Sequence, residues 1–144
     1  MVYNEQEFKA RVKKILNSTK QYIFLRSSRV YANEEILIEN SSRLVDITMD
    51  EEYLKTDEYA LSKARQEKIL EESGYLNWTI IRPYITYSKE RLQLGIYEKE
   101  DWLYRVLNGK TIIFSKDIEK YKTTLTYGYD VANIIADLIF EKKL

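Results

Sequence analysis

At 144 residues the chain has the size of one domain, and a chain of this length buries roughly two-thirds of its unfolded surface. It has no cysteine and no histidine, which excludes disulfides, thiolate nucleophiles, zinc–cysteine sites, His-ligated metals and serine–histidine hydrolases. Its 23 basic and 23 acidic residues cancel, which argues against a dedicated nucleic-acid-binding protein, because such proteins bind by neutralising phosphates.

The sequence gives no sign of a membrane segment, an export signal or a metal site. No apolar run approaches the length that a transmembrane helix needs, and the N-terminal MVYNEQE lacks the basic and apolar parts of a signal peptide. Acidic residues gather at 34–35 and 50–52 without the alternating spacing of a calcium loop. We therefore expect a cytoplasmic protein with no membrane partner and no metal.

The N-terminal part predicts a helix followed by a strand. Residues 4–18 carry apolar side chains at helical spacing, with basic residues on the other face. These apolar residues are Phe8, Val12, Ile15 and Leu16. Residues 22–25 form a short apolar run rich in strand-forming residues, which predicts a buried strand ending in a loop at 26–28.

A loop and a second helix follow. Residues 32–56 are acidic with no sustained period, so we expect a long surface loop with at most a short helix. Residues 57–73 predict a helix that has Thr56 or Asp57 as its N-cap and that ends at Gly74.

The next elements are a strand and a helix. Residues 78–81 predict a buried strand, which stops at Arg82 and the chain's single proline, Pro83. Residues 98–108 predict a helix that ends at Gly109.

The C-terminal part predicts two strands and a last helix. The strands are expected at 111–114 and 123–127, and an amphipathic helix at 130–143, with Asp130 as its cap. Helices that alternate with short buried strands indicate an α/β fold, and the absence of a linker predicts one unit over residues 1–144.

A phosphate-binding turn is missing from this α/β pattern. The chain has only four glycines, at 74, 95, 109 and 128, and no two of them have the spacing of a Gly-x-Gly-x-x-Gly turn or of a phosphate-binding loop. We therefore expect a partial, doubly wound Rossmann-like sheet with flanking helices that lacks the glycine-rich βαβ half.

Tyr59 and Lys63 form a Tyr-x-x-x-Lys pair on the helix predicted at 57–73. The spacing puts both side chains on one face, about one turn apart. An ammonium group near a phenol favours the phenolate, as a tyrosine requires when it acts as an acid or base near neutral pH. The alternative interpretation is a surface lysine covering a half-buried tyrosine, since 13 tyrosines and 15 lysines give about one such spacing by chance.

The surroundings of the pair favour the chemical interpretation. Ser27 and Ser28 follow one predicted strand, and Arg82 and Pro83 follow the next. Ligands of open α/β sheets bind at the carboxyl ends of the strands. A serine hydroxyl at this edge could hold a substrate carbonyl or alcohol beside Tyr59.

Four segments together resemble a known family. They are FLRSSRVYA (24–32), DEYALSKARQEKIL (57–70), WTIIRPYITYS (78–88) and LTYGYDVANIIADLI (125–139). In order and spacing they are similar to the second half of the NAD-dependent epimerase/dehydratase family of extended short-chain dehydrogenases/reductases. The resemblance covers nearly the whole chain from the first helix onward.

The resemblance implies roles for the residues that match it. Tyr59 would be the catalytic acid/base, Lys63 would favour its phenolate and bind the nicotinamide ribose, and Ser27 would orient the substrate, with Ser28 as a further substrate contact. Pro83, Tyr84 and Ile85 would lie near the nicotinamide, together with Tyr59 and Lys63. Thr86 and Tyr87 would contact the substrate.

The implied activity is an NAD(P)-dependent epimerase, dehydratase or reductase that acts on a sugar, in particular a nucleotide-linked one. Because the glycine-rich half is missing, we expect the 144 residues to be the catalytic half of a longer protein, inactive alone and unable to hold NAD or NADP alone. The resemblance also implies a homodimer through the helices at 4–18 and 57–73. The alternative is a non-catalytic interaction module that binds a protein or, less favoured, RNA.

Overall fold

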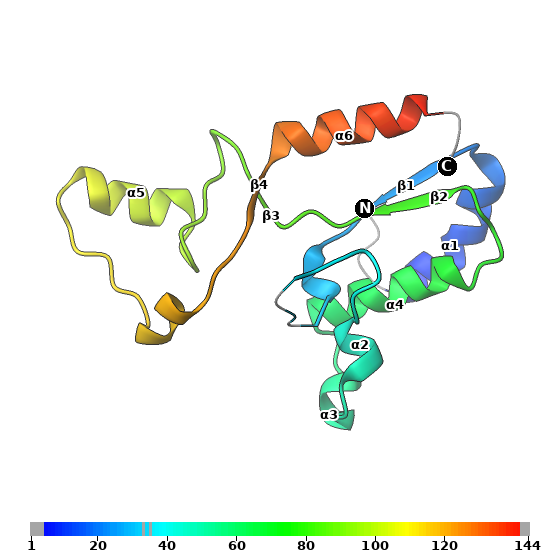
Figure 1. Ribbon diagram of the computed structural model, residues 1–144, viewed down its shortest axis with the longest axis horizontal. Helices are drawn as coiled ribbons and strands as arrows, with labels where there is room; N and C mark the ends of the chain where they lie inside the picture. Colours follow the sequence, from blue (N-terminus) through cyan, green and yellow to red (C-terminus); the bar gives the residue numbers. More distant parts are fainter. Residues whose placement is uncertain (1–4, 33, 35, 142–144) are drawn as a thin grey trace. The chain divides into compact units, whose positions relative to one another are not determined.

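The computed structural model describes residues 5–32, 34 and 36–141, and in them helices alternate with short parallel strands (Figure 1). The backbone divides into two compact units, one of residues 1–83 and 139–144 and the other of residues 84–138. The mixture of helices and small parallel sheets agrees with a partial α/β fold, while the single unit over 1–144 and the homodimer stay predictions.

The first unit is a two-stranded parallel sheet with two long helices on one face. Its elements are α1 (Glu5–Ser18), β1 (Tyr22–Leu25), the 3-10 turn η1 (Ser28–Val30), α2 (Leu44–Ile47), α3 (Glu51–Leu54), α4 (Tyr59–Glu71) and β2 (Trp78–Ile81). β1 and β2 pair in register from Tyr22↔Trp78 to Leu25↔Ile81. α1, β1, α4 and β2 therefore confirm the first predicted elements; Asn4 lies outside the described residues.

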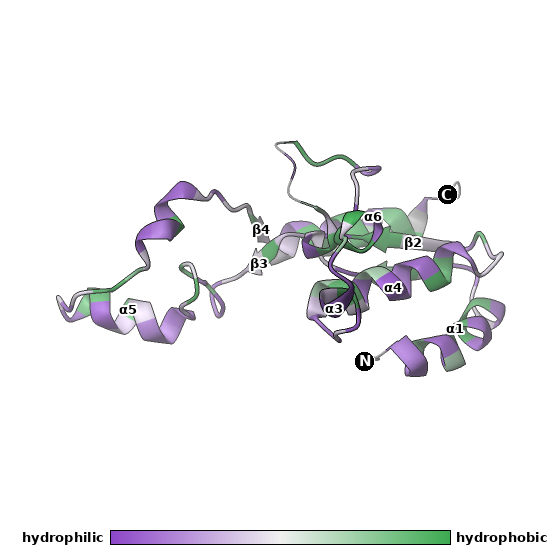
Figure 2. Cartoon of the chain, turned by 90° about the horizontal axis from the view of Figure 1, so that it is seen from below, coloured by the Kyte–Doolittle hydropathy of each residue, from purple (hydrophilic) through white to green (hydrophobic). Residues whose placement is uncertain are grey.

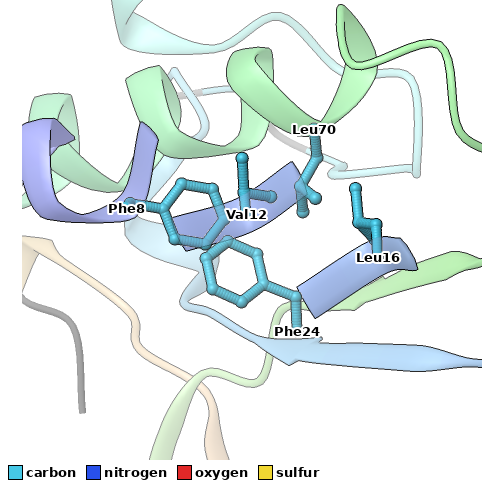
Figure 3. Packing of buried hydrophobic residues seen from close by; sticks show 5 residues of the cluster. All are labelled: Phe8, Val12, Leu16, Phe24 and Leu70. Atoms are coloured by element: carbon cyan, nitrogen blue, oxygen red, sulfur yellow. The ribbon is translucent and has the colours of Figure 1, made fainter. Parts of the chain in front are cut away.

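The core of this unit lies between the sheet and the pair α1 and α4, which lie side by side (Figure 3). Phe24 of β1 stacks on Phe8 of α1, with their ring centroids 4.7 Å apart. Val12, Leu16 and Leu70 complete the cluster, and all five side chains are buried. Each such side chain contributes about 1.5–3 kcal/mol by leaving water.

The start of α4 differs from the prediction. Its N-cap is Glu58, whose carboxylate accepts hydrogen bonds from the backbone N–H groups of Ala60, at 2.6 Å, and Leu61, at 3.3 Å. Thr56 instead donates its hydroxyl to the Tyr53 carbonyl at 2.7 Å, so the proposed cap at Thr56 or Asp57 was wrong. Beyond the helix, Gly74 has φ +78°, the left-handed conformation expected where a helix stops.

The segment 32–56 is more ordered than expected. It contains two short helices, α2 and α3, rather than at most one. An isolated antiparallel bridge joins Tyr31 to Arg43, and the Ala32 N–H group donates to the Ser42 carbonyl at 2.8 Å. These bonds hold the segment beside the end of β1.

The second unit contains another two-stranded parallel sheet. Its elements are β3 (Ile85–Tyr87), α5 (Lys99–Leu107), η2 (Lys116–Lys120), β4 (Leu125–Tyr127) and most of α6 (Gly128–Phe140). β3 and β4 pair from Ile85↔Leu125 to Tyr87↔Tyr127. β3 was not predicted, because a three-residue strand directly after Arg82-Pro83 looks like a loop in the sequence.

Two predictions for this unit were wrong. Residues 111–114 are not a strand, because two of their backbone carbonyls accept hydrogen bonds from side chains and not from a partner strand. The Arg105 guanidinium donates to the Thr111 carbonyl at 3.1 Å, and the Tyr97 hydroxyl donates to the Ile113 carbonyl at 2.7 Å. Helix α6 begins at Gly128, so Asp130 lies inside the first turn and not at the cap. A carboxylate there still favours the helix N-terminus.

The helices differ in their hydropathy (Figure 2). α1 and α4 mix hydrophilic and hydrophobic residues along their length, whereas α6 is mostly hydrophobic. Val131 of α6 is buried, yet Ile134 and Ile139 are 53% and 56% exposed. The amphipathic helix predicted at 130–143 is thus present up to residue 140, and residues 142–143 lie outside the described residues.

Candidate functional site

The chain segments that follow β1 and β2 run on side by side. The Arg26 N–H group donates to the Ile81 carbonyl at 2.7 Å, and the Ser28 N–H group donates to the Pro83 carbonyl at 3.1 Å. The parallel pairing thus continues past both strands. It brings Ser27 and Ser28 to the same sheet edge as Pro83, as predicted from the order of the elements.

The two serines have different environments. Ser27 is partly exposed and caps η1, its Oγ accepting a hydrogen bond from the Arg29 N–H group at 3.3 Å. Its own O–H group can therefore still donate to a ligand. Ser28 is only 7% exposed. The geometry favours Ser27 over Ser28 as the hydroxyl that a substrate reaches.

Tyr59 and Lys63 stand one turn apart on α4. The Lys63 ammonium lies 5.1 Å from the centroid of the Tyr59 ring, and Tyr59 is 50% exposed while Lys63 is partly buried. η1 packs against α4, and the Arg29 guanidinium that it carries lies 5.6 Å from the same ring centroid. Ser27 caps η1, and Arg29 of η1 contacts the Tyr59 ring, so the segment that follows β1 lies next to Tyr59.

The site is positively charged. Burial, and next the positive charge of Arg26, lower the pKa of Lys63 below its ordinary value. Burial also lowers the pKa of Arg26 to about 10, although the charges of Glu67, Tyr22 and Tyr59 act in the opposite direction. Arg26 therefore remains a cation at neutral pH.

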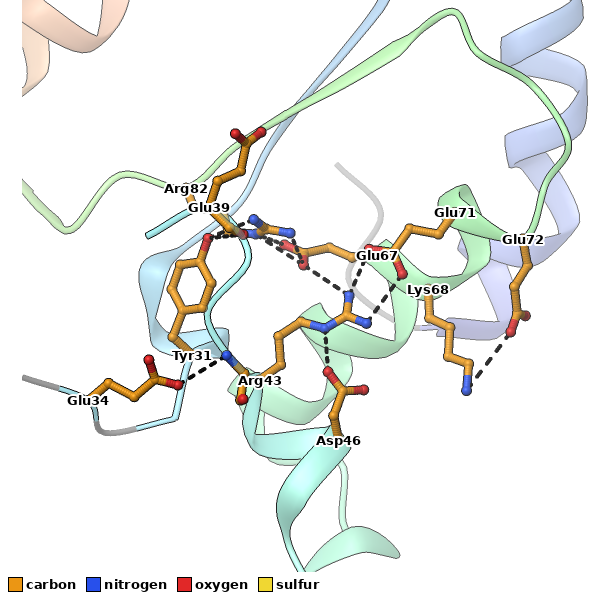
Figure 4. A network of polar contacts seen from close by, with 11 residues as sticks. Tyr31, Glu34, Glu39, Arg43, Asp46, Glu67, Lys68, Glu71, Glu72 and Arg82 are labelled. Atoms are coloured by element: carbon orange, nitrogen blue, oxygen red, sulfur yellow. Dashed lines mark hydrogen bonds and ion pairs between the residues drawn. The ribbon is translucent and has the colours of Figure 1, made fainter. Parts of the chain in front are cut away.

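A buried ion network links the elements that carry the candidate site residues (Figure 4). Glu67 of α4 is fully buried and lies 3.0 Å from the Arg82 guanidinium and 3.6 Å from that of Arg43. Arg82 donates a further hydrogen bond to the Tyr31 hydroxyl at 2.7 Å. Burial alone would lower the pKa of Arg82, but its hydrogen bonds and charge attraction to Glu67 raise it. The network ties the end of β2 to α4 and to the segment after η1.

A polar pocket of about 290 Å³ opens beside this network. Arg43, Asp46, Glu71 and Arg82 line it with the loop at 39–42. Arg43 is bonded to Asp46 at 2.8 Å and to Glu71 at 2.9 Å, so its charge is already balanced. The guanidinium groups that line the pocket are thus already paired with carboxylates, and Glu39 adds an exposed carboxylate to the lining.

A contact between a lysine and a tyrosine ring does not by itself identify a catalytic pair, because the chain has a second one. In the second unit the Lys110 ammonium lies 4.7 Å from the centroid of the Tyr104 ring. Tyr104 lies in α5, and Lys110 lies three residues after its end. What distinguishes Tyr59 is the sheet edge with Ser27 and the cations Arg26 and Arg29 around it.

Four predicted site residues belong to the second unit. Tyr84 is 37% exposed, and Ile85, Thr86 and Tyr87 form β3, where the Tyr87 ring packs 5.4 Å from that of Tyr127. Their roles near the nicotinamide and the substrate stay predictions.

Three residues of the site were not identified from the sequence: Arg26, Arg29 and Glu58. A signal for Arg26 exists, because side chains alternate along a strand and place Arg26 on the face of the buried Phe24. Arg29 and Glu58 have no such signal. They meet at 3.8 Å only because η1 packs on the start of α4.

No group of three or more acidic residues within 5–32, 34 and 36–141 could hold a metal ion. In the same part of the chain no helix is long and apolar enough to cross a membrane.

The residues of the site fit one end of a dinucleotide. A half-exposed phenol, a partly buried ammonium and a reachable hydroxyl suit the nicotinamide ribose and the carbonyl or alcohol that reacts with it. The chain's four glycines do not form the turn that binds the pyrophosphate.

Two parallel strands with helices on one face agree with a partial α/β fold of the NAD-binding class. The model of the NAD-binding family described as male sterility protein matches residues 3–129, and the chain belongs to this family. No curated protein and no solved structure matches the chain. The predicted relation to extended short-chain dehydrogenases/reductases is thereby confirmed at the level of an NAD(P)-binding relative, while the epimerase/dehydratase family itself stays a prediction.

Proposed function

We propose that the protein is an NAD(P)-dependent oxidoreductase in which Tyr59, Lys63 and Ser27 interconvert an alcohol and a carbonyl. The observation that supports this most directly is the Lys63 ammonium 5.1 Å from the centroid of the half-exposed Tyr59 ring, beside the strand ends that carry Ser27. The match to an NAD-binding family supports the cofactor class.

The chain's residues would move one proton. In reduction, the Tyr59 hydroxyl gives its proton to the substrate oxygen, and in oxidation the phenolate takes that proton back. Lys63, Arg26 and Arg29 attract the negative charge that Tyr59 carries between these events. The Ser27 hydroxyl donates to the substrate oxygen and orients it. The bound nicotinamide supplies or accepts the hydride.

The finer proposal rests on the resemblance of the four segments. On this basis we propose that the protein catalyses an epimerase, dehydratase or reductase reaction and that its substrate is a sugar, in particular a nucleotide-linked sugar. We also propose that the active protein contains a pyrophosphate-binding segment besides these 144 residues. The protein would form a homodimer through α1 and α4.

The substitution Tyr59→Phe tests the reaction. In the protein that carries the pyrophosphate-binding segment, we expect it to lower turnover by about 10²–10⁴-fold, the usual contribution of a general acid or base. Turnover is followed by nicotinamide absorbance with aldehydes, ketones and nucleotide-linked sugars as substrates. Turnover equal to that of the unchanged protein would refute the role of Tyr59.

Tyr104→Phe is the matched control, because Tyr104 has a lysine over its ring at similar distance. We expect it to leave turnover unchanged. Titration of residues 1–144 with NADH, followed by nicotinamide fluorescence, tests the missing pyrophosphate site separately. Tight binding there would contradict the proposal that a further segment is required.

A further inference from the structure

Arg26 is a buried charge that the proposed reaction does not require for contact with the substrate. We propose that Arg26 is a positioning residue, whose buried guanidinium beside the Tyr59–Lys63 pair controls how readily Lys63 gives up its proton. The proposal deepens the proposed function and rests on it for its catalytic meaning. Its effect on Lys63 can be measured without turnover.

The backbone places Arg26 against the face of α4 that carries the pair. Tyr59, Lys63 and Gln66 are spaced by four and three residues and therefore share one face of the helix. The Arg26 guanidinium donates a hydrogen bond to the side-chain oxygen of the fully buried Gln66. The hydrogen bond fixes the guanidinium against this face, one turn from Lys63.

Aromatic packing keeps the guanidinium in this place. Its central carbon lies 3.6 Å from the Phe24 ring centroid and 5.7 Å from that of Phe8. Arg26 is only 7% exposed. A charge so poorly solvated acts on its neighbours more strongly than a charge in water, because little solvent screens it.

The charges around Arg26 leave it a net cation. From α4 it faces Glu67, Tyr59 and Lys63, from β1 it faces Tyr22, and from α1 the ring of Phe8 packs against it. Glu67, the one buried anion among the described residues, also attracts Arg26, but it is paired with Arg82 at 3.0 Å and lies 3.6 Å from Arg43. Arg29 of η1 also lies near Tyr59, but its charge is paired with Glu58 at 3.8 Å. Glu67 thus balances part of the positive charge of Arg26, and Arg26 still acts on Lys63 as a cation.

One polar group of Arg26, its Nε–H group, makes no hydrogen bond with any of the described residues. The group is also buried. A buried donor without a partner costs stability, whereas a methionine at the same place would pack against Phe8 and Phe24 without this cost. An arginine at this place differs from a methionine mainly by its charge and by its hydrogen bond to Gln66.

The test is the titration of the Lys63 side chain, followed by NMR of its ε-CH₂ group and assigned with Lys63→Arg. In the unchanged protein we expect the midpoint below that of an ordinary lysine. In Arg26→Met the midpoint should move upward, towards the ordinary value, because the neighbouring cation is gone. A midpoint that stays in place in folded Arg26→Met would overturn the proposal.

A second variant and a control make the test decisive. Arg26→Gln also removes the charge but can still donate to Gln66, so it carries the test if Arg26→Met fails to fold. Arg65→Met is the control: Arg65 stands on α4 itself and donates to the carbonyls of Leu54 and Thr56, and its loss should leave the Lys63 midpoint in place. An equal upward shift in Arg65→Met would overturn the proposal, since it would show a general effect of charge.

The outcome for Lys63 is independent of the outcome for Tyr59. Should Tyr59→Phe retain turnover while Arg26→Met shifts the Lys63 midpoint, the proposed function fails and the electrostatic role of Arg26 stands. The reverse result, loss of turnover in Tyr59→Phe with an unmoved Lys63, removes only Arg26 from the site.

Discussion

The two units of this protein are built with very different amounts of buried apolar surface. The first has a continuous core of Phe8, Val12, Leu16, Phe24 and Leu70 below its sheet. In the described part of the second, Val131 is the one hydrophobic residue that is buried. Its helix α5 has no buried residue, and Leu107 is 75% exposed.

This difference agrees with the location of the proposed proton-transfer set in the first unit. A side chain that must hold a fixed geometry needs neighbours whose own positions are fixed by packing. Lys63 and Tyr59 stand on a helix whose inner face is buried in the core and whose Glu67 is locked in an ion network. The second unit has little such support of its own, so we expect it to be the less stable one.

The largest test of this comparison is Phe8→Ala. We expect it to lower the free energy of unfolding of the first unit by about 4 kcal/mol, because it removes a ring that stacks on Phe24 and leaves a cavity. Each unit holds one tryptophan, Trp78 and Trp102, so urea unfolding of single-tryptophan variants reports on each unit separately.

Leu107→Ala is the matched truncation in the second unit. Since Leu107 is largely exposed, its loss should change the unfolding free energy by less than about 0.5 kcal/mol. A cost for Leu107→Ala as large as that for Phe8→Ala would show that the comparison is wrong.

The ion network predicts the next largest effect. Glu67→Gln should destabilise the first unit by about 3 kcal/mol, because Arg82 and Arg43 then keep their charges without the buried anion. Asp117→Asn in the second unit breaks a pair with Lys120 whose side chains are 77% and 66% exposed, and should cost less than about 1 kcal/mol. Equal midpoints of urea unfolding for the two variants would argue against the network.

The elements that form the core of the first unit could be predicted from the sequence. Apolar spacing in α1 and the short apolar runs of β1 and β2 carry the information, because these elements bury their apolar residues. The same reasoning failed at 111–114, where the apolar run TIIF is not a strand and Ile113 is 75% exposed. An apolar run predicts a strand only where a partner strand pairs with it.

The site could be predicted only in part for a similar reason. Ser27, Tyr59 and Lys63 are proposed as site residues from local spacing and from resemblance, since each lies in a short recognisable segment. Arg29 and Glu58 join the site through the packing of η1 on α4, which no local pattern encodes. The ion network likewise joins Arg43, Glu67 and Arg82, which are distant in sequence.

Helix capping gives a smaller contrast between the units. Glu58→Ala should cost about 1 kcal/mol, because the Ala60 and Leu61 N–H groups lose their acceptor. Glu98→Ala at the start of α5 removes an N-cap residue whose side chain makes no cap hydrogen bond, and should cost less than about 0.5 kcal/mol. Thermal unfolding followed by far-UV circular dichroism measures both, and a larger loss for Glu98→Ala would contradict the capping assigned to Glu58.

The smallest predicted effect tests the local order of a loop in the second unit. The Ser88 hydroxyl donates to the Glu90 carboxylate at 2.9 Å, and this bond, followed by the bond of the Glu90 backbone N–H group and by the charge of Lys99, lowers the pKa of Glu90. Because the pKa is lower in the folded state, the stabilisation is present above the ordinary glutamate value and is lost as the pH falls through the folded value.

Ser88→Ala should therefore return the pKa of Glu90 towards its ordinary value, as NMR of the Glu90 carboxyl carbon would show across the acid range. Ser115→Ala is the control, because Ser115 precedes η2 in the same unit without a side-chain cap bond. Glu90 is exposed, so its titration reports the local hydrogen bond and not the packing of a core. An ordinary pKa for Glu90 in the unchanged protein would contradict this prediction. It would mean that the Ser88–Glu90 hydrogen bond does not form in solution and that this loop is less ordered than the structure shows.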